Sequence, residues 1–146
     1  MPIRCEIVSQ DRVVFQGQAD MVILPGTAGE MGVLPHHAPA LTTLKFGVVR
    51  VRRGGTDQVF AVAGGVAEVQ PDLVTVLADA AENVEEIDVK RAEFARKRAE
   101  EALAKGPTLA SDALLNIEAA LRRSNLRLDV VRRYRRSQNR FPGQQS

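Results

Sequence analysis

The residues that could do chemistry in this sequence are few and scattered. His36 and His37 stand side by side in a stretch rich in glycine and proline, and imidazole nitrogens are common metal ligands. No second cluster of Cys, His or acidic residues accompanies them, so the pattern favours a structural turn over a metal site. Ser9 and Asp11 could join a His in a hydrolytic triad, but no nucleophile motif surrounds them. The sequence therefore predicts no catalytic residue and no metal site, and it favours a protein that is not an enzyme.

The composition narrows the class of protein further. The 146 residues are 45% hydrophobic and 26% charged, which is typical of globular domains. The single cysteine, Cys5, excludes a disulfide framework and favours a reducing compartment such as the cytoplasm. No window approaches the roughly 18 apolar residues of a membrane span, and the amino terminus lacks the pattern of a signal peptide. We therefore expect membrane association only through a partner.

Positive charge concentrates in the last quarter of the chain, although the net charge is only +2. From residue 118 to residue 140 only Glu118 and Asp129 oppose it, so this stretch should attract an acidic surface or a polyanion. A nucleic-acid partner is disfavoured because only Tyr134 and Phe141 are aromatic there and no groove-reading motif occurs. An anionic lipid surface is also disfavoured. This basic stretch has the pattern of a helix, but the apolar face of that helix would lack Trp and Phe. The arginines concerned are Arg122, Arg123, Arg127, Arg132, Arg133, Arg135, Arg136 and Arg140.

Up to about residue 82 the pattern is one of short strands. Alternating or β-branched runs are separated by Gly and Pro, which indicates a β sandwich or barrel of roughly eight to ten strands. Gly54-Gly55 between two alternating runs predicts a tight hairpin turn. Gly64-Gly65 and Pro71-Asp72 separate the runs that follow.

Near Asp88 the spacing of apolar residues changes from the alternation of a strand to the three-to-four-residue repeat of a helix. Asp88 can cap a helix that ends near Ala104 and has a narrow stripe of alanines, and Gly106-Pro107 cannot continue it. A second helix, capped by Ser111 or Thr108, should run to about Arg135. The short connection predicts an antiparallel hairpin, which should be weak because small side chains bury little area.

The predicted fold class is thus a β sandwich followed by an α-helical hairpin, that is, about ten strands and then two antiparallel helices. We expect a β-sandwich domain over residues 1–84 and a two-helix regulatory hairpin over residues 85–136. The tail, residues 137–146, has no apolar period and should be disordered.

Several motifs of this sequence occur in one known family. The segment from Gly29 to Pro39 resembles the glycine-x-x-glycine-x-Leu-Pro-x-His-x-Pro motif of the epsilon family of F-type ATP synthases. Gly64 to Val69, Val74 to Leu77 and Ala81-Glu82 follow with the family spacing. The resemblance implies a ten-stranded sandwich docked beside the gamma subunit and the c-ring. It implies that Gly32, Leu34, Pro35 and His37 lie close to the partner.

The resemblance also implies a function without catalysis. Members of the family are rotor subunits of the central stalk, which couple proton translocation to ATP synthesis. Their helical hairpin lies folded on the sandwich, or extends along gamma towards the catalytic alpha and beta subunits and blocks ATP hydrolysis. The implied location is the cytoplasmic face of the bacterial plasma membrane, as a peripheral protein. The basic residues that would then face acidic surface are Arg122, Arg132, Arg133 and Arg136.

A shorter motif points to a regulatory ligand. Ile87 to Ala92 fits the Ile/Leu-Asp-x-x-Arg-Ala sequence with which some bacterial members bind ATP in the folded state. The alternative from the residues alone is an N-cap at Asp88 and a solvated helical charge at Arg91. No cofactor is required on either interpretation, and ATP is the candidate regulatory ligand. The residues that the resemblance implies for the ATP site are Glu82, Ile87, Asp88, Arg91, Ala92, Arg98, Arg123 and Arg127.

The change of period near Asp88 makes the division into two parts testable. A chain truncated after Val84 is expected to fold as a β domain, to join gamma and to support ATP synthesis, while latent ATP hydrolysis is released. Circular dichroism of the truncated chain and hydrolysis by the reconstituted complex measure these outcomes. An insoluble or unassembled product would show that the division is misplaced.

Overall fold

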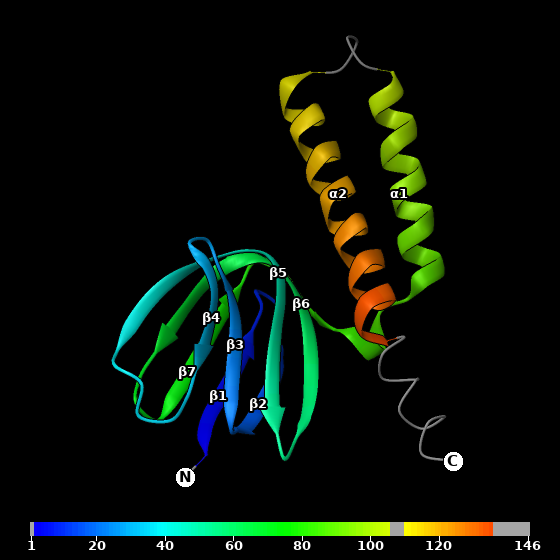
Figure 1. The fold of residues 1–146 in the computed structure, drawn as a ribbon. Helices are drawn as coiled ribbons and strands as arrows, with labels where there is room; N and C mark the ends of the chain where they lie inside the picture. The colour runs from blue at the N-terminus through cyan, green and yellow to red at the C-terminus, as the bar shows by residue number, and fades with distance from the viewer. Residues whose placement is uncertain (1, 106–109, 136–146) are drawn as a thin grey trace, which may run out of the picture. The chain divides into compact units, whose positions relative to one another are not determined.

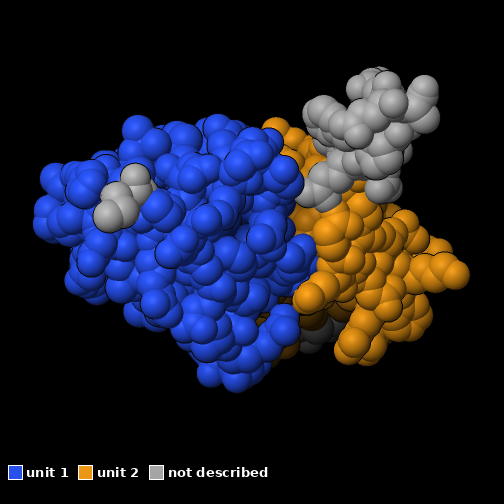
Figure 2. All heavy atoms as spheres, turned by 90° about the horizontal axis from the view of Figure 1, so that it is seen from below, with its two compact units in different colours: residues 1–83 blue, residues 84–146 orange. Residues whose placement is uncertain are grey.

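The computed structural model describes residues 2–105 and 110–135. The chain divides into two compact units, Met1–Asn83 and Val84–Ser146, which are coloured separately in Figure 2. The expected sandwich followed by two helices is confirmed.

The first unit is built from one sheet of eight strands among its described residues. In space their order is β2-β1-β7-β6-β5-β3-β4, with β8 paired to β6 (Figure 1). Neighbouring strands are antiparallel except for β1 and β7, which are parallel. The strands are β1 (Ile3–Val8), β2 (Val13–Ala19), β3 (Met21–Gly26), β4 (Gly29–Val33), β5 (Ala40–Arg53), β6 (Thr56–Val69), β7 (Leu73–Ala78) and β8 (Ala81–Asn83).

Two bent strands fold this sheet into a sandwich. β5 and β6 have 14 residues each, and their pairing is interrupted between Leu44–Gly65 and Phe46–Ala63. Gly64 and Gly65 at this bend have φ values of 94° and 125°, which favour glycine. On one side of the bend β6 pairs with β7, and on the other side it pairs with β8. The expected ten strands are therefore eight in the structure, because each of the two long strands contributes a half to both layers.

Alternating side chains fill the space between the layers. Ile3, Cys5 and Ile7 of β1 are fully buried, while the residues between them face outward. Phe60 of β6 packs against Phe15 of β2, with ring centroids 5.3 Å apart. Burial of Cys5, with a smaller contribution from Glu6, raises the pKa of its thiol to about 12. Cys5 is therefore a core residue and is protonated at neutral pH.

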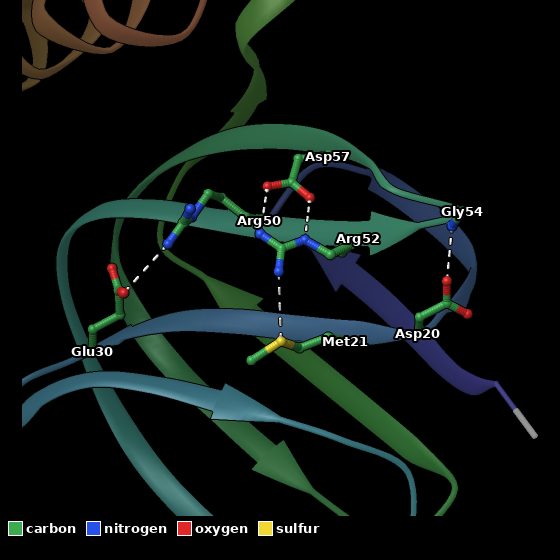
Figure 3. A network of polar contacts seen from close by, with 7 residues as sticks. All are labelled: Asp20, Met21, Glu30, Arg50, Arg52, Gly54 and Asp57. Atoms are coloured by element: carbon green, nitrogen blue, oxygen red, sulfur yellow. Dashed lines mark hydrogen bonds and ion pairs between the residues drawn. The ribbon is translucent and has the colours of Figure 1, made fainter.

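Polar contacts fix the hairpin between β5 and β6, as predicted at Gly54-Gly55. Both residues have positive φ, and Arg53 pairs with Thr56 across the turn. The backbone N–H of Gly54 donates to Oδ2 of Asp20 at 2.8 Å (Figure 3). A few residues further along, Arg52 donates to both carboxylate oxygens of Asp57 at 2.8 and 3.2 Å. These contacts select the register of the hairpin, although an exposed ion pair stabilises a protein by only about 0–1 kcal/mol.

The second unit is a helical hairpin, with α1 and α2 running side by side (Figure 1). Ala92 and Ala99 form the buried stripe of α1, as expected, and Ser124 and Val130 are buried on α2. The expected cap of the second helix at Ser111 is wrong, because Ala110 is the N-cap and Ser111 is already helical. Thr108, Arg136 and the tail lie outside the described residues. The elements are η1 (Val84–Glu86), α1 (Val89–Ala104), α2 (Ser111–Val130) and η3 (Val131–Arg135), a π-helical turn.

The bend in β6 generates a stability prediction. A Cβ at Gly65 would clash with the backbone of Leu77 and Ala78, and its φ of 125° disfavours side chains. We expect Gly65→Ala to lower the free energy of unfolding in urea by at least about 2 kcal/mol. The matched control is Gly54→Ala, because Gly54 has a φ of 58° and open space around it, and it should cost about 1 kcal/mol. Equal losses in both variants would contradict the role assigned to the bend.

Candidate functional site

An exposed apolar row crosses the outer face of one layer. The register places Val13 opposite Val8, Val8 opposite Leu77, and Leu77 opposite Val66. Opposite residues on paired strands lie on the same face of a sheet, so these four side chains form one row over β2, β1, β7 and β6. Val13 is 55% exposed and Leu77 is 49% exposed. We call these four residues the apolar row.

The surroundings of the apolar row extend it on one side and limit it on another. Thr43 of β5 stands opposite Val66, and the exposed Leu41 lies on the same face two residues earlier. The next row of the sheet is polar, because Glu68 and Glu6 both pair with Thr75. The surface is thus an apolar strip with an acidic border, a pattern that is typical of protein interaction sites.

The predicted partner-binding loop is a firmly held turn. The backbone N–H of His36 donates to the carbonyl of Pro71 at 2.7 Å, and His36 has a φ of 67°. His37 Nδ1 lies 2.8 Å from the carbonyl oxygen of Ala38. Leu34 is exposed and Pro35 is half-buried. Leu34 is the only one of the four predicted loop residues that presents a large exposed apolar side chain.

Gly32 lies beside a flexible side chain of the neighbouring strand. It lies on β4 opposite Ile23 of β3, and a Cβ at this position would clash with the end of the Met21 side chain. Because the end of the Met21 side chain can move, this packing does not by itself require glycine at position 32. A direct contact of Gly32 with a partner stays a prediction.

Most of the predicted ATP residues on or next to α1 lie at the start of the helix, and Arg98 lies further along it. Oδ1 of Asp88 accepts a hydrogen bond from the backbone N–H of Arg91 at 3.1 Å, so Asp88 is the N-cap of α1. Ile87 and Ala92 are buried. Arg91 and Arg98 are exposed and each directly precedes a buried alanine, so they share one flank of α1. The cap role of Asp88 is confirmed, and its contact with a nucleotide stays a prediction.

The predicted ATP residues of α2 occupy the corresponding flank. Arg123 and Arg127 stand one residue before and three residues after the buried Ser124. In an antiparallel helix pair, these positions fall on the same side as Arg91 and Arg98. Four guanidinium groups can therefore approach one anion from two helices. Two details oppose a preformed site: the guanidinium of Arg98 lies over the Phe94 ring, 5.8 Å from its centroid, and Glu82 belongs to β8 of the first unit, opposite Ala61.

The opposite flank of the hairpin contains a groove of about 420 Å³. None of the predicted ATP residues lines it. Arg132, predicted to contact a partner, does line it, whereas Arg122 and Arg133 are exposed and Arg133 lies 3.9 Å from Asp129. The main lining residues are Val89, Glu93 and Arg96 of α1, Leu128 of α2, and Arg132 and Arg135 of η3.

Two features of these surfaces were missed by sequence reasoning. The apolar row had a visible signal, because Leu77 and Val8 interrupt the alternation of apolar and polar residues in β7 and β1. The contacts of Arg135, described below, had no such signal among so many arginines. In the described part of the chain no group of three His, Cys, Asp or Glu side chains is arranged for a metal ion. Likewise, none of the helices described is long and apolar enough to cross a membrane.

The geometry defines a class: a β-sandwich with an exposed apolar row on its outer face, followed by a helical hairpin. Residues 2–84 match the beta-sandwich domain of the ATP synthase delta/epsilon chain, and residues 85–132 match its long alpha-helix domain. The chain therefore belongs to the ATP synthase delta/epsilon chain family.

Relatives and solved structures agree with this assignment. The ATP synthase epsilon chain of Herpetosiphon aurantiacus is 43% identical over 138 residues, which cover 94% of this chain and all of the relative (100%). The epsilon chain of Dehalococcoides mccartyi is 42% identical over 134 residues, or 92% of this chain and 95% of the relative. A chain of the Euglena gracilis mitochondrial ATP synthase, solved as OSCP/F1/c-ring, is similar with a TM-score of 0.70 and 26% identity, over 86% of this chain and 78% of that one. A chain of the Tetrahymena thermophila central stalk and c-ring shares the fold, with a TM-score of 0.58 and 10% identity over 90% and 97% of the two chains.

Proposed function

We propose that this chain is a rotor subunit of the central stalk of an F-type ATP synthase and has no catalytic activity of its own. The apolar row on the first unit supports this proposal most directly. A subunit that transmits torque needs a stiff body with a complementary surface, and a sandwich with an exposed apolar strip provides both. The relatives named as epsilon chains and the central-stalk assemblies among similar structures support the same function.

The proposed partners follow from the two units. The apolar row, with Leu41 and the loop around Leu34, would dock on gamma and the c-ring. The subunit would then be peripheral, at the cytoplasmic face of a bacterial plasma membrane, and would participate in the coupling of proton translocation to ATP synthesis. The basic hairpin would meet acidic surface on the alpha and beta subunits through Arg122, Arg132, Arg133 and Arg136.

Charge on the apolar row tests the docking face. We expect Leu77→Glu to weaken binding of the isolated chain to purified gamma by at least about tenfold, because a carboxylate would have to be buried at the interface. The measurement is calorimetric titration of each variant with gamma. Leu115→Glu is the matched control, because Leu115 is also exposed, at 63%, but lies on α2. Unchanged affinity of a folded Leu77→Glu variant would exclude this face as the docking site.

We propose further that the hairpin inhibits ATP hydrolysis and that ATP controls it. The buried residues of α1 are small, so the hairpin should have two arrangements that are close in free energy. We call the folded arrangement, in which the two helices pack together, closed, and the extended arrangement open. A ligand that binds only the closed form shifts the balance by about 2.7 kcal/mol at a hundredfold excess over Kd. The shared flank of Arg91, Arg98, Arg123 and Arg127 supports ATP as that ligand. Plentiful ATP would keep the hairpin closed, and scarce ATP would release it to block hydrolysis.

Titration with ATP tests this regulatory site. We expect binding in the millimolar range or tighter, with affinity lowered at least about tenfold in Arg91→Ala and in Arg127→Ala, because each loses a charge-assisted contact with phosphate. Arg96→Ala is the matched control, because Arg96 lines the groove on the other flank of α1. The absence of heat, or equal affinities in all three variants, would show that the motif is only a helix start.

A further inference from the structure

One arginine connects η3, which continues α2, to the residues that precede α1. We call these residues, Val84 to Ile87, the entry segment of the hairpin. Arg135 is at the end of η3, and its side chain is only 22% exposed. Its Nη2 donates to the carbonyl oxygen of Ile87 at 2.9 Å, and also to that of Val84. Its Nε lies 3.9 Å from a carboxylate oxygen of Glu85. A single guanidinium thus contacts three residues that precede α1, across 48 to 51 positions of sequence.

The carbonyl groups that Arg135 contacts belong to two buried residues of a segment that is otherwise exposed. Val84 and Ile87 are buried, and Ile87 precedes the N-cap, so its carbonyl is outside the hydrogen-bond ladder of α1. Directly after η1, the backbone N–H of Ile87 donates to the carbonyl oxygen of Val84 over a long distance, 3.4 Å. A buried carbonyl needs a donor, and a guanidinium supplies several in a fixed geometry and remains charged at all physiological pH values.

The backbone of η3 directs Arg135 towards these carbonyls. Val131–Arg135 is a π-helical turn, which is wider than an α-helical turn and changes the direction of position 135. Along the rest of the hairpin, the buried residues of α1 are the small Ala92 and Ala99. The base of the hairpin is therefore closed by polar contacts and the remainder by weak apolar packing.

We propose that Arg135 is a latch that keeps the hairpin closed. The end of α2 can leave the entry segment only when the guanidinium releases the carbonyls of Val84 and Ile87. This inference deepens the proposed function and rests on it for its consequence alone: an open hairpin is the form that would reach the catalytic subunits. Breaking the latch then favours inhibition even where ATP is plentiful.

Hydrogen exchange of the isolated full chain tests the latch. In Arg135→Ala we expect the amides of Ile87 to Ala92 and of the last turns of α2 to exchange at least about tenfold faster than in the parent. Arg135→Lys should be intermediate, because an ammonium group lacks the fork of donors. Arg133→Ala is the matched control: it removes the same charge from the same turn, but the Arg133 side chain is 67% exposed. The amides of β1 and β7 in the first unit are the internal standard.

The outcomes separate the latch from the proposed function. Equal hairpin exchange in Arg135→Ala and Arg133→Ala would overturn the latch. The latch would also be overturned if, in both Arg135→Ala and Arg135→Lys, hydrogen exchange became faster in β1 and β7 by the same factor as in the hairpin. The effect would then be global unfolding and not local opening. In the reconstituted synthase, Arg135→Ala should lower ATP hydrolysis below that of the parent. A loosened hairpin with unchanged hydrolysis would retain the latch and count against the inhibitory role.

Discussion

The bend of two long strands is the constraint on which the first unit depends. β5 and β6 pair with each other along nearly their whole length, yet each takes part in both layers of the sandwich. Gly64 and Gly65 permit this because both have positive φ values that disfavour a side chain, and at Gly65 the backbone of β7 also leaves no room for one. Without the bend, the buried faces of β1 and β7 would not meet those of β3 and β5. The core and the outward-facing apolar row are therefore two consequences of one backbone feature.

The two units have opposite mechanical properties. The first has a continuous core of large side chains, including Phe60 and Ile3, and a hydrogen-bonded sheet that holds its outer face rigid. The second consists of two helices that bury few side chains, namely Ala92 and Ala99 on α1 and Ser124 and Val130 on α2. A body with a large core, joined to a hairpin with few buried side chains, fits the proposal of a subunit that stays docked while its hairpin changes conformation.

Electrostatics give the hairpin three distinct regions. One flank carries the four arginines that would bind ATP, the other flank forms the groove with Arg96 and Arg132, and the base is closed by Arg135. Similar side chains thus have different surroundings: the ring of Phe94 beside Arg98, the groove beside Arg132, and backbone carbonyls of the same unit beside Arg135.

Local physics allowed much of this protein to be predicted from its sequence. The strands, the turn at Gly54-Gly55, the cap at Asp88 and the alanine stripe depend on neighbours within a few residues, so their patterns are visible in the chain itself. Tertiary structure decided what depends on distant partners. The apolar row exists only because strand register aligns Val13, Val8, Leu77 and Val66, and Arg135 acquires its role only because α2 returns to the entry of the hairpin. A cross-strand register and a contact across 48 residues have no local signal, because the free energy that selects them comes from the packed whole.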